Sequence, residues 1–122
     1  MKKFISLLIL FSALNVHANS IDLTGHYRCQ GNDFLNHSTF DEPTVVTKTG
    51  ETYLFTWINK NLVFYGTAIL QDNVISSVFW TPTHLNAPGV VTYRVLPNGD
   101  LKGKWSIKDS RMVGDEYCTK LK

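Results

Sequence analysis

Short runs of strand-favouring residues, each ended by turn residues, constrain the fold of this chain more than any other feature. After residue 18, no segment has the spacing of apolar residues that an amphipathic helix needs, whereas Val, Ile, Thr, Tyr, Phe and Trp recur in groups. We therefore expect an all-β domain. The pattern predicts eight strands, over residues 24–30, 44–49, 52–58, 62–70, 74–80, 90–96, 101–108 and 113–121.

The connections between these strands are mostly short, which predicts how the strands pair. Asn98-Gly99 lies between the sixth and seventh runs, and this dipeptide readily adopts the positive φ angles of a tight hairpin. Strands joined by few residues pair with their sequence neighbours in antiparallel orientation. Closing such a meander leaves no open sheet edge, so we expect a small, closed, eight-stranded antiparallel up-and-down barrel.

The two cysteines, Cys29 and Cys118, lie in the first and last predicted strands. These strands are neighbours in a closed barrel and lie far apart in an open meander. We therefore expect one disulfide between them, with two free thiols as the alternative. A redox-active pair is disfavoured because the cysteines of such a pair normally lie close in sequence.

The N-terminal residues have the order of a secretory signal peptide. Two lysines precede an apolar run over residues 4–14, and Val16 and Ala18 suit the positions just before a cleavage site. A membrane anchor is the alternative, but it needs about 20 apolar residues. We expect a signal peptide over residues 1–18 that is cleaved after Ala18, one domain over residues 19–122, and a periplasmic or secreted location with no membrane anchor.

The charge balance gives no indication of a nucleic-acid partner. The sequence has 12 basic and 10 acidic residues, but Lys2 and Lys3 belong to the predicted signal peptide. The other 10 basic residues equal the 10 acidic ones in number and do not cluster. We therefore expect no basic surface for nucleic acid. The oligomeric state stays open.

Alternate connections of an up-and-down barrel lie at the same end. One end receives the tight turns near residues 50, 72 and 98, and the other end receives the long loops. Binding residues gather on long loops at one rim of a rigid scaffold, although solvated loops without function are the alternative. The long-loop end comprises residues 31–43, 59–61, 81–89 and 108–112. The candidate binding rim comprises Asp33, Phe34, His37, Phe40, Asp41, Glu42, His84, Asp109 and Arg111.

Catalysis and metal binding have little support in the sequence. His37 and His84 share the rim with acidic residues, but neither has a spacing typical of metal ligands. The chain has no H-E-x-x-H, G-x-S-x-G, phosphate-binding or dinucleotide-binding motif. We expect no enzyme activity, no catalytic residues, no metal and no cofactor.

Alternation assigns some side chains to a face of the sheet. In the seventh strand, apolar residues alternate with lysines and a serine, so Trp105 is expected to point inward as a core residue rather than as a ligand contact. The third and fourth strands are apolar on both faces. This pattern indicates that the outer surface covers something as well, such as a loop, a second subunit or a partner.

Several segments resemble known families. Leu23-Thr24-Gly25-His26-Tyr27 resembles the L-T-G-x-W start of avidin-like proteins and the G-x-W start of lipocalins, with Tyr27 in the place of Trp. This resemblance implies a barrel architecture and does not extend to biotin binding. Residues 47–53 followed by 56–57, then 65–67 and 98–105, resemble small exported bacterial domains that have no settled activity. Tyr27-Arg28-Cys29 is similar to the start of periplasmic lysozyme inhibitors, whose S-G-x-x-Y loop this chain lacks.

Two functions remain as hypotheses. The first is a non-enzymatic binding module that holds a small apolar or amphipathic ligand in the barrel mouth. The second is a protein-interaction factor, either an inhibitor of a lysozyme-like enzyme or a binder of host or matrix proteins. A ligand carrier needs an internal cavity of a few hundred cubic ångströms, whereas a protein binder can have a fully packed interior.

Overall fold

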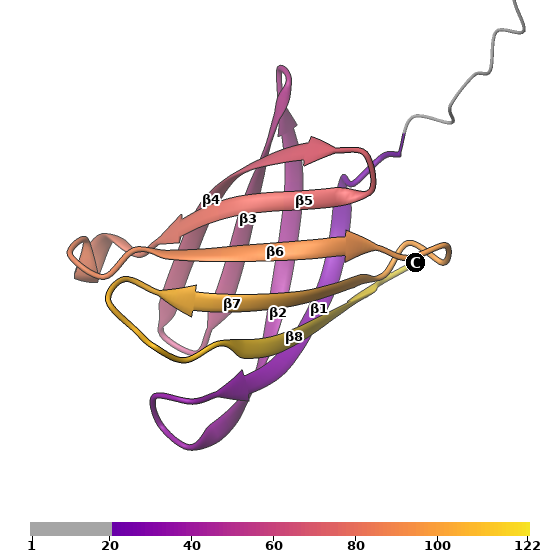
Figure 1. Ribbon diagram of the computed structural model, residues 1–122. Helices are drawn as coiled ribbons and strands as arrows, with labels where there is room; N and C mark the ends of the chain where they lie inside the picture. The colour runs from indigo at the N-terminus through magenta and orange to yellow at the C-terminus, as the bar shows by residue number, and fades with distance from the viewer. Residues whose placement is uncertain (1–20) are drawn as a thin grey trace, which may run out of the picture.

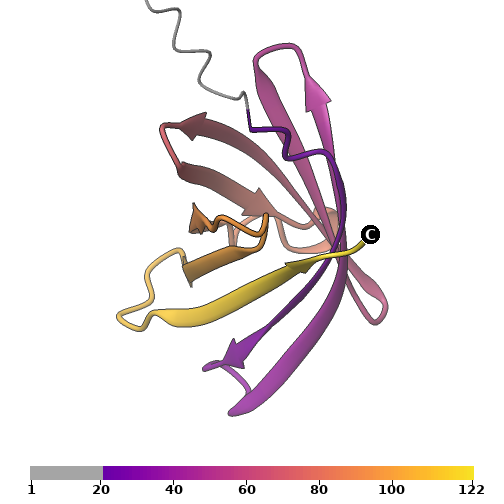
Figure 2. The same cartoon turned by 90° about the vertical axis from the view of Figure 1, so that its right-hand side faces the viewer.

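The computed structural model describes residues 21–122, which form a closed eight-stranded β-barrel (Figure 1, and Figure 2 in a view turned by 90°). Each strand pairs antiparallel with its sequence neighbour, and β8 returns to pair with β1. The predicted up-and-down barrel is therefore confirmed. The strands are β1 (Gly25–Asp33), β2 (Ser38–Thr49), β3 (Thr52–Asn59), β4 (Leu62–Gln71), β5 (Val74–Trp80), β6 (Gly89–Val95), β7 (Leu101–Ile107) and β8 (Gly114–Lys120), with one 3-10 turn, η1 (Pro82–His84), before β6.

The predicted signal peptide and its cleavage site lie outside the described residues. Within residues 21–122, no helix has the length and apolar character needed to span a lipid bilayer.

A disulfide between Cys29 and Cys118 joins β1 to β8, as predicted. The two cysteines lie directly opposite each other in the pairing of these strands. That pairing covers five residue pairs, whereas the pairing of β1 with β2 covers nine. The covalent bond therefore closes the barrel where β1 pairs with β8, a pairing about half as long as that of β1 with β2.

β1 and β2 form a long hairpin where the sequence predicts a loop over residues 31–43. The turn itself comprises only residues 34–37, so the loop prediction is wrong for the residues on both sides of it. Pro43 favours a loop by sequence because proline is rare inside a sheet. In the structure, β2 pairs with β3 only from Thr44 onward, so Pro43 lies in a part of β2 that pairs with β1 alone.

The interior is packed at one end and hollow at the other. The packed end lies beside the turns after β2, β4 and β6. There, the hydroxyl group of the buried Tyr27 donates a hydrogen bond of 2.7 Å to the carbonyl oxygen of Leu23. The side chains buried at this end include Leu23, Tyr27, Val46, Tyr53, Phe55, Ala68, Ile75 and Leu101.

The outer face of the barrel carries apolar side chains on neighbouring strands. Ile69 on β4, Val78 on β5 and Val90 on β6 are exposed, and they border a shallow depression of about 670 Å³. The outward apolar surface that the sequence predicts for the third and fourth strands therefore extends over β5 and β6. The expectation that this outer surface packs against a loop, a second subunit or a partner remains a prediction.

Candidate ligand-binding cavity

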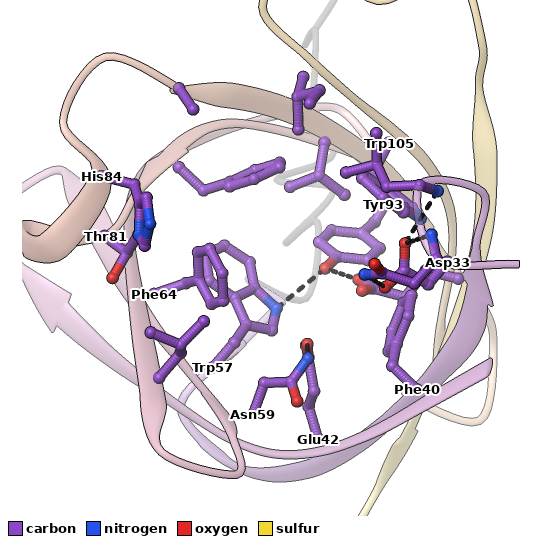
Figure 3. A pocket seen from close by; sticks show the side chains of 18 residues that line it. Asp33, Phe40, Glu42, Trp57, Asn59, Phe64, Thr81, His84, Tyr93 and Trp105 are labelled. Carbon is purple, nitrogen blue, oxygen red and sulfur yellow. Dashed lines mark hydrogen bonds between the residues drawn. The ribbon is translucent and has the colours of Figure 1, made fainter. Parts of the chain in front are cut away.

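The hollow end of the barrel holds a cavity of about 290 Å³ (Figure 3). Its mouth is bordered by the β1–β2 turn, the end of β3, and the β5–β6 loop, which contribute Asn36, Asn59 and Ala87. These connections all lie at the end of the barrel for which the sequence predicts a binding rim. The cavity is therefore the mouth of the barrel and extends inward to Tyr93 and Glu116.

Aromatic side chains make up most of the apolar wall. Phe79 contacts Trp57 on one side and Trp105 on the other, with ring centroids 6.0 and 6.4 Å apart and the rings at steep angles. Trp105 thus packs in an aromatic cluster, as a core residue does, and also borders the cavity, which the sequence analysis did not expect. The aromatic residues that line the cavity are Phe40, Trp57, Phe64, Phe79, Tyr93 and Trp105.

Glycines on neighbouring strands leave room along the barrel wall for four of these rings. Phe79 lies opposite Gly89 in the pairing of β5 with β6, and a Cβ atom at Gly89 would overlap the Phe79 ring. Trp105 and Gly114 form the same arrangement between β7 and β8. Because each ring occupies the space that a side chain would otherwise take, the middle of the cavity stays open. Phe40 with Gly31 and Tyr93 with Gly103 repeat this pairing.

Two glutamates enter the cavity from strands on either side of β1. Glu42 on β2 lies opposite Cys29, and Glu116 on β8 lies opposite Gly31. Their side chains are buried, with relative exposures of 8 % and 7 %. Acidic residues are seldom this buried unless their charge is paired. No Lys or Arg is found among the described residues that line the cavity.

Each glutamate accepts one hydrogen bond from another cavity residue. The Tyr93 hydroxyl donates to Oε2 of Glu116 and accepts a bond of 3.2 Å from Nε1 of Trp57 (Figure 3). Nδ2 of Asn59 donates to Oε1 of Glu42 over 3.0 Å. The other oxygen of each carboxyl group, Oε1 of Glu116 and Oε2 of Glu42, accepts no hydrogen bond from the described residues. One oxygen of each group thus remains available to a ligand.

Burial shifts both carboxyl groups toward neutral pH. The pKa of Glu116 is raised to about 8, mainly by desolvation and to a smaller extent by the negative charge of Glu42, against the lowering effect of the Tyr93 hydrogen bond. Desolvation likewise raises the pKa of Glu42 to about 7, against the lowering effect of the Asn59 hydrogen bond. Burial also raises the pKa of Tyr93 well above its ordinary value, so its hydroxyl group stays protonated. Below pH 7, both buried glutamates are therefore mostly protonated and uncharged when no ligand is bound.

The disulfide prevents the sulfur atoms near Glu116 from forming a metal site with it. The sulfur of Cys118 lies 3.7 Å from Oε2 of Glu116, and the sulfur of Cys29 is close by. Zinc and related ions bind cysteine as the thiolate. Because both sulfurs belong to the disulfide, this group has no thiolate to offer.

The structure brings only part of the predicted rim to the cavity. Asp33, Phe40, Glu42 and His84 line it. Phe34 lies behind the wall, where its ring stacks on Trp105 at 4.5 Å. Three further rim residues, His37, Asp109 and Arg111, are exposed and do not line the cavity.

Two acidic rim residues have local structural partners. Asp33 accepts hydrogen bonds from the backbone amides of Leu35 and Asn36, so it shapes the β1–β2 turn. Asp41 forms a bidentate ion pair with Arg28 on the exposed outer face of the β1–β2 hairpin, away from the cavity.

The sequence analysis missed Glu116, Tyr93 and Trp57 as site residues. For Glu116, the sequence contains a feature that predicts its inward orientation, namely its position two residues before Cys118. Cys118 must face inward if it bonds across the β1–β8 seam, and side chains two residues apart in a strand share a face. An inward carboxyl group at position 116 follows from that alternation.

Comparisons with known proteins leave the site to be interpreted from its geometry. The sequence matches no protein-family model, and no curated protein shows significant similarity to it.

Proposed function

We propose that this protein is a non-enzymatic binding module that holds a small amphipathic ligand in the mouth of its barrel. The observation that carries this proposal is the cavity of about 290 Å³, which is open at one end and lined by six aromatic residues. Ligand sites are commonly concave and apolar, with a few polar groups that orient the ligand. Glu42, Asn59 and Glu116 supply such groups.

The open interior favours this function over protein binding. A protein-interaction factor uses its surface, and its interior can be packed throughout. Here, glycines on the strands let the aromatic rings lie against the wall, so the middle of the hollow end is left unfilled. An unfilled cavity lowers the stability of a small domain. Its presence despite that cost supports a role in ligand binding.

We also propose that the protein acts outside the cytoplasm. The disulfide between Cys29 and Cys118 supports an oxidising compartment, because structural disulfides are rare in the cytosol. The predicted signal peptide over residues 1–18 gives the same location, in the periplasm or outside the cell.

Binding of a neutral apolar dye tests the proposed function. The full chain is expressed with export and purified with its disulfide formed. N-phenyl-1-naphthylamine, excited directly, is expected to gain fluorescence on binding and to be recovered chemically unchanged. Val91 lines the cavity whereas its neighbour Val90 faces outward, so the two positions form a matched pair. V91F is expected to reduce dye binding at least tenfold, and V90F is expected to leave it unchanged.

A second variant covers the possibility that V91F does not fold. Ala87 is exposed at the mouth of the cavity, and A87W is expected to obstruct entry without altering the core. Circular dichroism checks that each variant retains the β-barrel. If the dye does not bind, or binds folded V91F and A87W as tightly as the unmodified protein, the proposal is wrong.

A further inference from the structure

We infer that the ligand is a small organic ammonium ion with an apolar body, whose charged group lies between Glu42 and Glu116 while the body contacts the aromatic wall. This inference rests on the proposed function and adds the chemical class of the ligand.

The ionisable side chains of the cavity are almost all acidic. Glu42 and Glu116 are deeply buried, and Asp33 lies near the mouth. The one basic side chain among the described lining residues is that of His84, which is exposed at the mouth. An anionic ligand would therefore meet carboxyl groups with no cation to offset them. A cationic ligand would supply the counter-charge that the two buried glutamates lack.

The free oxygens of the two glutamates are suited to a cation. Glu116 is faced by Tyr93 from β6 and by Glu42 from β2, and the disulfide lies beside it. Glu42 is faced by Asn59, with Asp33 as the nearest further charge. None of these groups is a cation. A buried carboxylate with no counter-ion is strongly disfavoured, and an ammonium group that contacts both glutamates offsets part of that cost.

The aromatic wall contributes to the same preference. The faces of aromatic rings attract cations, most strongly in tryptophan, and a cluster of such rings is a known way to hold quaternary ammonium groups. Trp57 and Tyr93 both border the cavity, and the hydrogen bond between them links this wall to Glu116. The aromatic rings and the carboxyl groups therefore both favour a ligand with a positive charge.

Binding of a cation is coupled to release of protons. In the empty cavity at pH 7, burial keeps Glu116 largely protonated, because its pKa is raised to about 8. A bound cation favours the ionised form, so the carboxyl proton passes to the solvent. Affinity for a ligand with a permanent positive charge is therefore expected to rise with pH between 6 and 9.

The test compares two probes of similar shape and different charge. Benzyltrimethylammonium carries a permanent positive charge, and neopentylbenzene is its neutral counterpart. Binding of each to the unmodified protein is followed at pH 6 and pH 9 by calorimetry and by tryptophan emission. The cation is expected to bind at least tenfold more tightly at pH 9 than at pH 6, and at pH 9 more tightly than the neutral probe. Calorimetry in two buffers of different ionisation enthalpy should detect the released proton.

Substitution of the glutamates identifies the groups responsible. E116Q and E42Q preserve side-chain size, and each is expected to weaken cation binding at pH 9 at least tenfold and to reduce its dependence on pH. E51Q is the matched control, because Glu51 is exposed in the turn between β2 and β3 at the opposite end of the barrel. E51Q is expected to bind both probes as the unmodified protein does.

The outcomes separate this inference from the proposed function. If the neutral probe binds in the cavity and the cation binds no more tightly at pH 9, the ammonium inference is wrong and the binding module stands. Cation affinity unchanged in both E116Q and E42Q also overturns it. If neither probe binds, and N-phenyl-1-naphthylamine does not bind either, the proposed function fails together with the inference.

Discussion

At the scale of single residues, Glu42 and Glu116 give the fold an unusual dependence on pH. Burial raises the pKa of these groups to about 7 and about 8, against an ordinary value of 4.5. Between about pH 4.5 and about pH 8, the folded protein binds more protons than the unfolded chain, so its stability decreases as the pH rises. The contribution is fully present below about pH 4.5 and is lost by about pH 8.

We therefore expect the free energy of unfolding to be lower at pH 9 than at pH 5, by on the order of 6 kcal/mol. Urea denaturation at a series of pH values measures this difference. The E42Q/E116Q double variant is expected to show a flatter profile, whereas E51Q should retain the slope. A protein more stable at pH 9 than at pH 5 would contradict this assignment of the buried carboxyl groups.

At the scale of strands, pairs of glycine and aromatic residues shape the cavity. Phe79 on β5 lies across Gly89 on β6, and the ring covers the glycine. An aromatic ring that covers a glycine keeps the strand pair well packed even though one residue has no side chain. The size of the cavity is therefore determined partly by residues of the neighbouring strand that do not themselves project into it.

The substitution G89A is expected to displace the Phe79 ring toward the cavity. A methyl group at this position cannot coexist with the ring in its present place, so we expect a loss of about 1–3 kcal/mol in stability and weaker binding of N-phenyl-1-naphthylamine. Urea denaturation and dye titration measure the two effects. In the F79L background the same substitution should cost less, because the obstructing ring is gone. An equal cost in both backgrounds would show that Phe79 does not cause the effect.

At the scale of the whole molecule, the disulfide holds the barrel closed. It links residues separated by 89 positions and lies at the short β1–β8 seam. In the chain-entropy model, a loop of this length corresponds to up to about 4 kcal/mol of stability. Both cysteines are fully buried, and Cys118 contacts the carboxyl group of Glu116. Loss of the bond therefore affects the seam and the inner wall of the cavity together.

The double variant C29A/C118A is expected to be less stable than the unmodified protein by about 2–4 kcal/mol. Chemical denaturation measures this loss. Dye binding is expected to weaken as well, because the seam is free to open beside Glu116. Unchanged stability in a folded double variant would contradict the view that the bond holds the seam closed.

The sequence by itself determined the strand order, the closed meander and the disulfide. These features depend on local rules: turn residues such as Asn98-Gly99 keep connections short, and short connections restrict each strand to its neighbours. The two cysteines then identified the strands that close the barrel. Local rules also located the end at which the cavity opens, although the loop predicted over residues 31–43 is only a turn of residues 34–37 within one long hairpin.

The tertiary structure alone decided that the interior is hollow at that end and which groups surround the space. A cavity is the difference between the volume that the barrel encloses and the volume that its side chains fill, and that difference depends on contacts between residues distant in the chain. The ring of Phe79 over Gly89 is one such contact. The raised pKa values of Glu42 and Glu116 have the same origin, because desolvation arises only when the other strands exclude water from the two carboxyl groups.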